Sequence, residues 1–263
     1  MGSFTATLDD GDFFGSSLAL LRDLNGDGVN EIVIGANLDD DGGNDHGAVY
    51  ILSLEGIRPP GVVVAEQKIS DTAGNFTAIL DDGDNFGVAI ASLGDLNGDD
   101  IGDVAVSALR DDDGGTNYGA VYILFMDNDR TVKSYQKISD ATGGFTAVLD
   151  IGDTFGISLA NLGDVDGDGI TDIAVGTTND DDGGSNRGAV YVIFLNADGT
   201  VKEHQKISNS AGNFTATLEN NDNFGRSLAG LGDLDGDGIP DLAVGADKDD
   251  DGGYARERHM SCS

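Results

Sequence analysis

FGISLANLGDVDGDGITDIAVG, from Phe155 to Gly176, contains the features that decide the fold of this 263-residue chain. An alternating apolar segment leads into a loop rich in aspartate and glycine, and the loop runs directly into the apolar run DIAVG. Alternation with a period of two, and short apolar runs bounded by Gly and Asp, are typical of β-strands. The stretch therefore predicts two strands joined by an acidic loop.

The same stretch recurs at a nearly constant interval, which is the signature of a repeat architecture. The dipeptide FG begins at four positions, 72, 69 and 69 residues apart: Phe14, Phe86, Phe155 and Phe224. The acidic loops and the run DDDGG keep the same step, and GAVY and QKIS recur in the first three units. We predict a single repeat domain over residues 1–263. Its units are approximately 1–70, 71–139, 140–208 and 209–253, followed by an atypical tail at 254–263.

Each unit reads as about four antiparallel strands. In the third unit they are FGISLANLGD (155–164), DIAVG (172–176), GAVYVIFL (188–195) and TVKEHQKIS (200–208), and FTATL near Phe214 is a candidate further strand. No segment long enough for a helix escapes interruption by Gly or Asp. A unit of about four strands repeated at this length predicts an all-β fold, a β-propeller. It has four blade starts, and the last blade is incomplete because neither GAVY nor QKIS follows the final DDDGG.

The acidic loops place oxygen atoms at regular positions. Oxygen-bearing side chains occupy the first, third, fifth and ninth positions of all four loops, and glycine permits the tight backbone between them. Calcium takes about six to eight oxygen ligands and favours flexible, carboxylate-rich loops. We expect the carbonyl of the seventh residue to bind as well, while its side chain enters the core. The predicted ligands of about four Ca²⁺ ions are Asp23, Asn25, Asp27, Val29 and Glu31; Asp95, Asn97, Asp99, Ile101 and Asp103; Asp164, Asp166, Asp168, Ile170 and Asp172; and Asp233, Asp235, Asp237, Ile239 and Asp241.

Three other interpretations of the loops are an EF-hand, a site for a different metal and a solvated turn. An EF-hand needs a bidentate Glu at the twelfth position, whereas these loops have Ile34, Val106, Val175 and Val244 there. Magnesium prefers a rigid octahedron, and zinc is disfavoured because no His or Cys falls in the loops. A merely solvated acidic turn is the alternative; four copies in phase argue against it, because clustered carboxylates without a cation would repel one another. Asp100 replaces a glycine of the second loop and Glu31 is a longer arm in the first, so we expect the third and fourth loops to bind most tightly.

The ordered submotifs FG-x-S-L-A, D-x-D-G-D-G-x-x-D and GAVYV resemble the FG-GAP repeat of integrin α-subunit β-propellers and their bacterial relatives. The resemblance covers nearly the whole chain. It implies blades with calcium loops on one rim and a role in adhesion or ligand binding. Propellers of the integrin type have about seven blades, whereas this chain has four starts.

Three further motifs are interpreted as structural. DDDGG is expected to be a solvated loop between strands, with a second cation as the alternative. The lysine of QKIS is expected to be a local charge partner in an acidic unit. The repeated phenylalanines of FG are expected to be core anchors between blades rather than a ligand-facing ring.

Composition limits the function classes. The net charge of −34 repels nucleic-acid backbones and anionic lipids, and no apolar run approaches a membrane span. The only cysteine, Cys262, allows no intrachain disulfide. No GxSxG, HExxH or phosphate loop is present, so no enzyme is predicted. We expect an extracellular or cell-surface fragment whose signal lies outside this chain, with a protein or glycan ligand and self-association through the incomplete blade. A carbohydrate-binding lectin and an accessory domain of a secreted hydrolase remain the alternatives.

Overall fold

The computed structural model describes residues 4–55 and 61–250, together with the backbone of residues 258–262. These residues form four antiparallel sheets, each a simple meander in chain order. The first three sheets contain β1 (Phe14–Leu21), β2 (Glu31–Ala36), β3 (Ala48–Glu55) and β4 (Val62–Ile69); β5 (Phe86–Gly94), β6 (Asp103–Ala108), β7 (Ala120–Met126) and β8 (Val132–Ile138); and β9 (Ser158–Gly163), β10 (Asp172–Thr177), β11 (Ala189–Leu195) and β12 (Val201–Ser208). The all-β prediction is confirmed.

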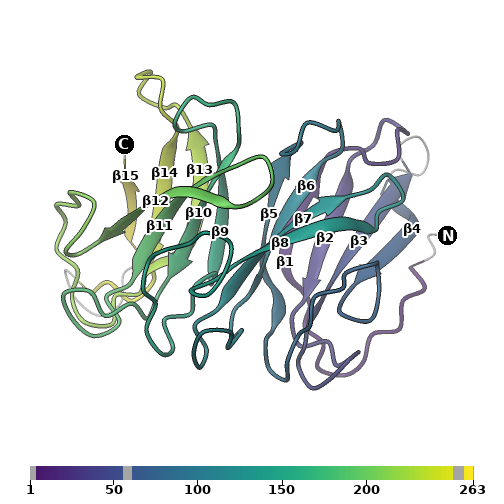
Figure 1. Cartoon of the computed structure of the whole chain (residues 1–263), viewed down its shortest axis with the longest axis horizontal. Helices are drawn as coiled ribbons and strands as arrows, with labels where there is room; N and C mark the ends of the chain where they lie inside the picture. The colour runs from purple at the N-terminus through teal and green to yellow at the C-terminus, as the bar shows by residue number, and fades with distance from the viewer. Residues whose placement is uncertain (1–3, 56–60, 251–257, 263) are drawn as a thin grey trace.

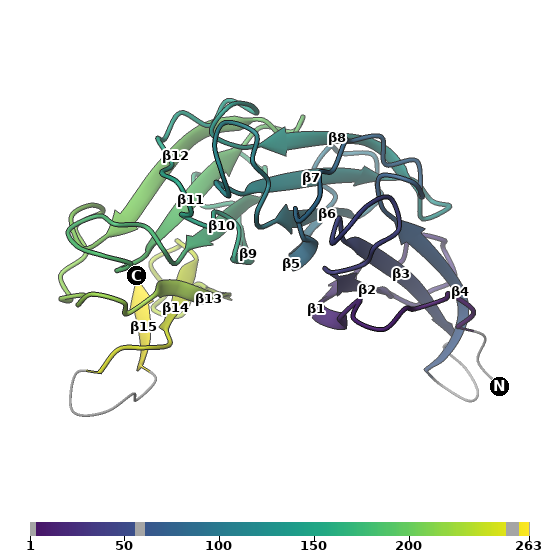
Figure 2. The same cartoon turned by 90° about the horizontal axis from the view of Figure 1, so that it is seen from below.

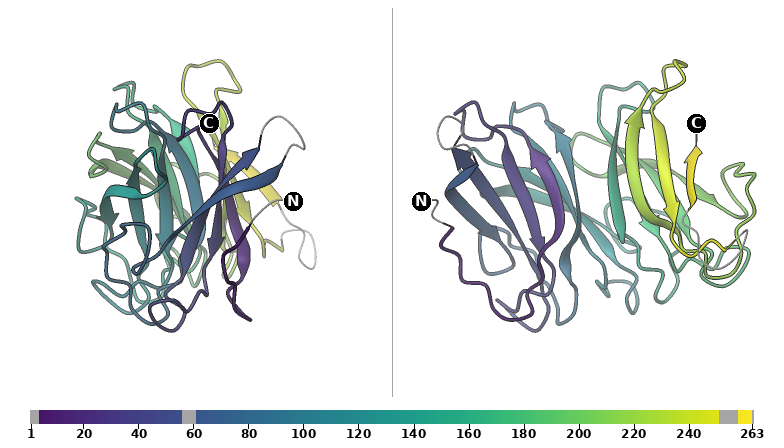
Figure 3. Two further views of the ribbon diagram at one scale, coloured as in Figure 1. Left: turned by 90° about the vertical axis from the view of Figure 1, so that its right-hand side faces the viewer. Right: turned by 180° about the vertical axis from the view of Figure 1, so that it is seen from behind.

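The four sheets stand side by side as the blades of a β-propeller. The first strands of successive sheets contact one another along the chain, β1 with β5, β5 with β9 and β9 with β13 (Phe224–Gly232). Figure 1 shows the sheets following one another from the N-terminus to the C-terminus. Figure 2 shows them arranged as an arch, with β1, β5, β9 and β13 on its inner side. The two end sheets stand apart, and each leaves one face without a neighbouring blade (Figure 3).

The fourth sheet has three described strands, β13, β14 (Asp241–Ala246) and β15 (Arg258–Cys262). The prediction that the fourth blade is incomplete is therefore confirmed. Its third strand, β15, is formed by the tail that we predicted to be atypical. Backbone pairing places Val244 opposite Met260, as Val175 lies opposite Tyr191 in the third sheet. Residues 251–257 and 263 of the predicted tail and of the last DDDGG lie outside the described residues.

The predicted strand at FTATL is wrong. Residues 214–218 have no strand conformation, and their backbone is held by a side chain instead, because the Leu218 amide donates to Asn209 Oδ1 at 3.1 Å. The Phe214 ring lies against Phe224, with ring centroids 4.8 Å apart. The segment therefore adds an aromatic side chain to the apolar core of the blade and does not form a strand.

The FG and GAVY motifs meet at the junction between consecutive blades. Gly119 begins the GAVY segment of the second blade, and its Cα faces the carbonyl of Phe155 in the third blade so closely that an added Cβ would lie 2.2 Å from that oxygen. The amide of Phe155 donates to the carbonyl of Tyr118 at 3.0 Å, which joins the two backbones. The same close approach pairs Gly47 with Phe86 and Gly188 with Phe224. The glycine is thus required by the packing of one blade on the next.

The aromatic rings of FG are core anchors, as predicted, in the three blades that have a preceding blade. Phe86, Phe155 and Phe224 are fully buried, and Phe155 packs edge-on against Tyr191 of GAVY with ring centroids 5.9 Å apart. Apolar clusters fill each junction, and each contains residues of both neighbouring sheets. The core therefore lies within and between the blades, and the acidic loops project from one end of the sheets.

Candidate metal centre

Each acidic loop connects the first strand of a blade to the second, and its backbone amides fix the carboxylates. In the third loop the amides of Gly167 and Gly169 donate to the two oxygens of Asp164 at 2.7 and 2.8 Å. The amide of Asp168 donates to Asp166, and the amide of Ile170 donates to Asp168 at 2.8 Å. The corresponding bonds recur in the first, second and fourth loops. The sequence therefore folds each loop into the same curl around its own acidic side chains.

The ninth residue of each loop lies at the beginning of the second strand and is buried. Glu31, Asp103, Asp172 and Asp241 are at most 5% exposed. In the third loop one oxygen of Asp172 accepts the amide of Val165 at 2.9 Å and the other accepts the amide of Leu195 at 3.0 Å. Burial raises the pKa of Asp103 to about 6, and the charges of Asp99 and Asp95 add to the effect. A buried carboxylate beside further carboxylates is an arrangement that a cation stabilises.

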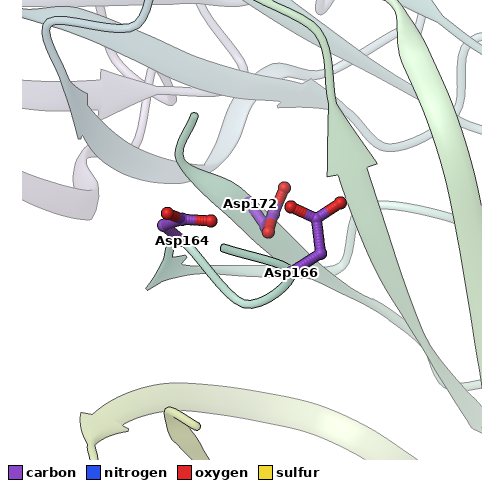
Figure 4. A group of neighbouring side chains, drawn as sticks. All are labelled: Asp164, Asp166 and Asp172. Carbon is purple, nitrogen blue, oxygen red and sulfur yellow. The ribbon is translucent and has the colours of Figure 1, made fainter. Parts of the chain in front are cut away.

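The third and fourth loops bring three carboxylates together. Asp164, Asp166 and Asp172 each place an oxygen within 4.8 Å of the others (Figure 4), and so do Asp233, Asp235 and Asp237. The first two loops have Asn25 and Asn97 at the third position, where an amide oxygen replaces a carboxylate. All-oxygen donor sets of this kind suit calcium and not zinc. The residues present therefore fit the predicted ion.

The seventh residues do not enter the core as predicted. Ile101 and Ile170 are half-buried and pack at the edge of the core, and Ile239 is 52% exposed. In the first two blades the second residue of the loop takes the buried position instead, since Leu24 and Leu96 are 5% and 3% exposed. The amide of the second residue is tied to the buried ninth carboxylate, which turns its side chain toward the next blade. Sequence reasoning missed this residue, although an apolar side chain stands at the second position of all four loops.

Lysines from the fourth strands of two blades contact the acidic loops. Lys202 Nζ lies 2.6 Å from an oxygen of Asp166 and 2.6 Å from one of Asp168. In the second blade Lys133 contacts Asp99 at 2.8 Å. The Lys202 ammonium holds the pKa of Asp168 below its usual value. The first blade has Val64 at the corresponding position, so the loops differ in the positive charge beside them.

The DDDGG runs are only in part the solvated loops that the sequence predicted: the second aspartates Asp40, Asp112 and Asp181 are exposed, but the first aspartates are not. Their first aspartates, Asp39, Asp111, Asp180 and Asp249, are at most 3% exposed. The lysine of QKIS pairs with two carboxylates of the run in its own unit: Lys206 lies 2.7 Å from Asp180 and 2.6 Å from Asp182. In the first blade Lys68 contacts Asp39 at 2.7 Å, and Tyr50 of GAVY donates to the same carboxylate at 3.1 Å. The prediction of QKIS lysines as local charge partners is confirmed. In the first three units their ammonium groups lie beside the carboxylates to which the alternative interpretation assigned a second cation.

A second set of buried carboxylates lies just before the FG motif and makes stability depend on pH. Asp153 is 4% exposed, and its Oδ2 accepts the amide of Asp150 at 2.8 Å. Burial raises its pKa to about 6, and the nearby charge of Asp180 contributes. The carboxyl group of an unfolded aspartate has a pKa of about 3.9. Between this value and the folded pKa of about 6, the folded state therefore holds more protons than the unfolded state. Stability should therefore rise as the pH falls through 6 toward 4.

The Asp153→Asn variant tests this pH dependence. The side-chain amide oxygen of the introduced asparagine can still accept the hydrogen bond from the Asp150 backbone amide. The substitution removes the free-energy cost of burying a negative charge. We expect the free energy of unfolding at pH 7.5 to rise by about 1–3 kcal/mol, and the difference from the original chain to vanish near pH 4. Urea denaturation at both pH values measures it, with the exposed neighbour changed in Asp150→Asn as the control. Equal effects of the two variants at pH 7.5 would contradict a cost that arises from burial.

Comparisons with known proteins agree with the repeat and its fold. The family model of the FG-GAP repeat matches residues 14–52, 155–193 and 224–255. The chain is 34% identical over 170 residues to integrin alpha-PS5 of Drosophila melanogaster and 35% identical over 168 residues to integrin alpha-2 of Mus musculus. It is 30% identical over 167 residues to integrin alpha-4 of Xenopus laevis. These alignments cover 62–63% of this chain but only 13–15% of the relatives. No helix among the described residues is long and apolar enough to cross a membrane.

Proposed function

Since three stretches of this chain match the FG-GAP repeat and the chain is similar to integrin α chains, we propose that it is a calcium-binding β-propeller module for adhesion or ligand binding outside the cell. The calcium would be structural, held by the acidic loops that join the first and second strands of the blades. No catalytic residue is assigned. The candidate ligands are those predicted above, one set in each of the four loops.

One observation carries the calcium proposal: four loops orient their carboxylates by the same network of hydrogen bonds from backbone amides. In the third loop both oxygens of Asp164 accept amide hydrogens, and Asp172 is anchored in the core by two more. Such a network fixes the loop without neutralising its charge, because amides are uncharged. A divalent cation would supply that charge, and it would link the turn to the strand that carries Asp172.

Isothermal titration of the chelator-treated protein with calcium tests the proposal. We expect a saturable heat with a stoichiometry of about four ions per chain, and a much weaker response to magnesium. The double variant Asp164→Asn with Asp166→Asn should lose one ion from that number. Asp112→Asn is the control, since Asp112 is an exposed acid of a DDDGG run outside the loops. The absence of any saturable calcium heat would sink the metal assignment.

Lys202 is expected to weaken calcium binding at the third loop. Its ammonium contacts Asp166 and Asp168, two of the carboxylates that would bind the ion, and this contact must be released or shared when the ion enters. We predict that Lys202→Gln raises the calcium affinity of this loop by about threefold to tenfold, a change of about 0.7–1.4 kcal/mol. Competition with a calcium-sensitive dye measures it, and Lys206→Gln, which alters the DDDGG pairing instead, is the comparison. An unchanged affinity in Lys202→Gln would show that the lysine does not compete.

The adhesion or ligand-binding part of the proposal rests on the family alone. The aligned relatives are integrin α chains, of which this chain spans a small part. Binding of the fluorescently labelled, calcium-loaded protein to arrays of extracellular proteins and of glycans would test it. Retention on proteins that is lost with chelator supports the proposal, whereas retention only on glycans would favour a lectin. Retention on neither array would contradict a ligand-binding role for the isolated module.

A further inference from the structure

We propose that Arg130 of the second blade neutralises the buried Glu31 of the first blade, so that the first acidic loop keeps its shape without a bound cation. Arg130 lies in the turn between β7 and β8, and Glu31 is the ninth residue of the first loop. Arg130 is thus a positioning residue and not a metal ligand. Its consequence for calcium affinity rests on the proposed function, whereas the charge pairing itself does not.

A chain of hydrogen bonds joins the two residues across the junction between the first and second blades. Nη1 of Arg130 donates to Oγ of Ser53 on β3 at 3.2 Å, and this hydroxyl donates to Oε1 of Glu31 at 3.0 Å. One hydroxyl group therefore separates the guanidinium from the carboxylate. Ser53 and Glu31 are both 1% exposed, so little water screens the attraction between the two charges.

The other hydrogen bonds to Glu31 come from uncharged groups of its own loop. Oε1 also accepts Nδ2 of Asn25 at 2.9 Å, and Oε2 accepts the backbone amide of Leu24 at 2.9 Å. Uncharged donors satisfy the carboxylate oxygens but do not compensate the buried negative charge. The guanidinium behind Ser53 is placed to compensate it.

The first loop also lacks the lysine that two other loops receive from the fourth strand of their own blade. Val64 stands at the position from which Lys133 and Lys202 contact their loops. Those lysines contact acids at the third and fifth loop positions, whereas the bonds from Arg130 lead to the buried ninth residue. Arg130 therefore brings from the next blade a positive charge that the first blade does not provide at this strand.

The packing of this junction makes room for the arginine. At the next junction, between the second and third blades, Phe125 holds the position of Ser53 and Gly199 holds the position of Arg130. A Cβ added at Gly199 would lie 3.2 Å from the tip of the Phe125 ring, so the large and the small residue fit each other. The first junction exchanges the two sizes. The exchange keeps a large residue opposite a small one and adds a charge.

Arg130 holds this place in spite of two unfavourable features. Its φ is +71°, close to the +78° of Gly199, and this conformation is unfavourable for a residue with a Cβ. Its Nε is buried and has no acceptor among the described residues, which leaves a donor without its hydrogen bond. Attraction to the buried carboxylate of Glu31 offsets these costs.

A calcium ion would meet this positive charge in the first loop. The candidate ligands there include Asn25, whose amide is uncharged, and Glu31, whose charge Arg130 compensates. Because like charges repel, calcium binds less tightly beside a guanidinium than it would without one. The first loop should therefore fill with calcium at a higher concentration than the third loop.

A double-mutant cycle in the presence of chelator tests the charge pairing without calcium. We expect Arg130→Gln to raise the unfolding equilibrium constant by about tenfold in the original chain and by less than about threefold in the Glu31→Gln background, as measured by urea denaturation. Arg22→Gln is the control, since Arg22 is an exposed basic residue directly before the same loop. If Glu31→Gln does not fold, Ser53→Ala replaces it, because that variant breaks the chain of bonds. Equal effects of Arg130→Gln in the two backgrounds would overturn the pairing, and so would a coupling of equal size to the exposed Asp129 in Asp129→Asn.

Calcium titration followed by the NMR signals of single amides tests the consequence for the ion. The amides of Gly26 and Gly28 report the first loop and those of Gly167 and Gly169 report the third, since each donates to the first aspartate of its loop. We expect Arg130→Gln to lower the calcium Kd of the first loop by about tenfold and to leave that of the third loop unchanged. An unchanged Kd at the first loop, or an equal change at both loops, would overturn the inference. If no loop responded to calcium, the proposed function would be contradicted instead, and the cycle in chelator would still decide the role of Arg130.

Discussion

Removal of calcium by a chelator is expected to lower the melting temperature by about 10 °C or more. Each loop that binds at 100 times its dissociation constant adds about 2.7 kcal/mol to the stability of the folded state. In a domain of this size 1 kcal/mol corresponds to about 2–4 °C, so two saturated loops suffice for the expected shift. The physical reason is the crowding of carboxylates: Asp164, Asp166 and Asp172 have oxygens within 4.8 Å of one another, so their negative charges repel.

Differential scanning calorimetry measures this shift, and ionic strength has to be matched. A chain with a net charge of −34 is stabilised by any salt through screening, so the comparison is between calcium and magnesium at equal ionic strength. The effect of calcium should remain in Asp112→Asn and shrink in the double variant of Asp164 and Asp166. A melting temperature that responds equally to both cations would show that the loops bind no specific ion.

Gly119→Ala is expected to destabilise the fold by about 3 kcal/mol or more. Gly119 has a φ of +85°, a conformation that costs a residue with a Cβ about 1–2 kcal/mol. Its new methyl group would also lie 2.2 Å from the carbonyl oxygen of Phe155 and 2.9 Å from that of Leu109. The backbone cannot move aside easily, because the Gly119 amide donates to the carbonyl of Asp111 at 2.9 Å. Overpacking of this kind typically adds about 1–3 kcal/mol.

Urea denaturation of Gly119→Ala and of a matched glycine separates the two contributions. Gly152 has a nearly equal φ of +83°, but a Cβ added there meets no atom within 4 Å. Gly152→Ala should therefore cost only the backbone strain, about 1–2 kcal/mol, and the remaining loss in Gly119→Ala reports the junction between the second and third blades. Equal losses in the two variants would mean that this close approach contributes nothing to stability.

More of the candidate site than of its surroundings could be predicted from the sequence. The candidate ligands follow from spacing alone, since four oxygen-bearing positions recur in every loop and the twelfth residue argues against an EF-hand. The burial of Asp180 could not be derived in that way, because Lys206 reaches it from a strand that begins at Val201. A signal did exist, since DDDGG and QKIS keep the same step along the chain. Only the sheet shows that the two motifs meet.

The repeat, the all-β character and the acidic loops can be predicted from the order of residues, because these depend on short-range periodicity and on chemistry at fixed spacing. Which of several identical residues are covered depends on tertiary packing. Leu24 and Leu234 occupy the same position of the same motif, yet Leu24 is 5% exposed and Leu234 is 68% exposed. The difference arises from the neighbouring blade, which covers one and not the other. Burial is a property of the assembled blades, and no local pattern in the chain encodes it.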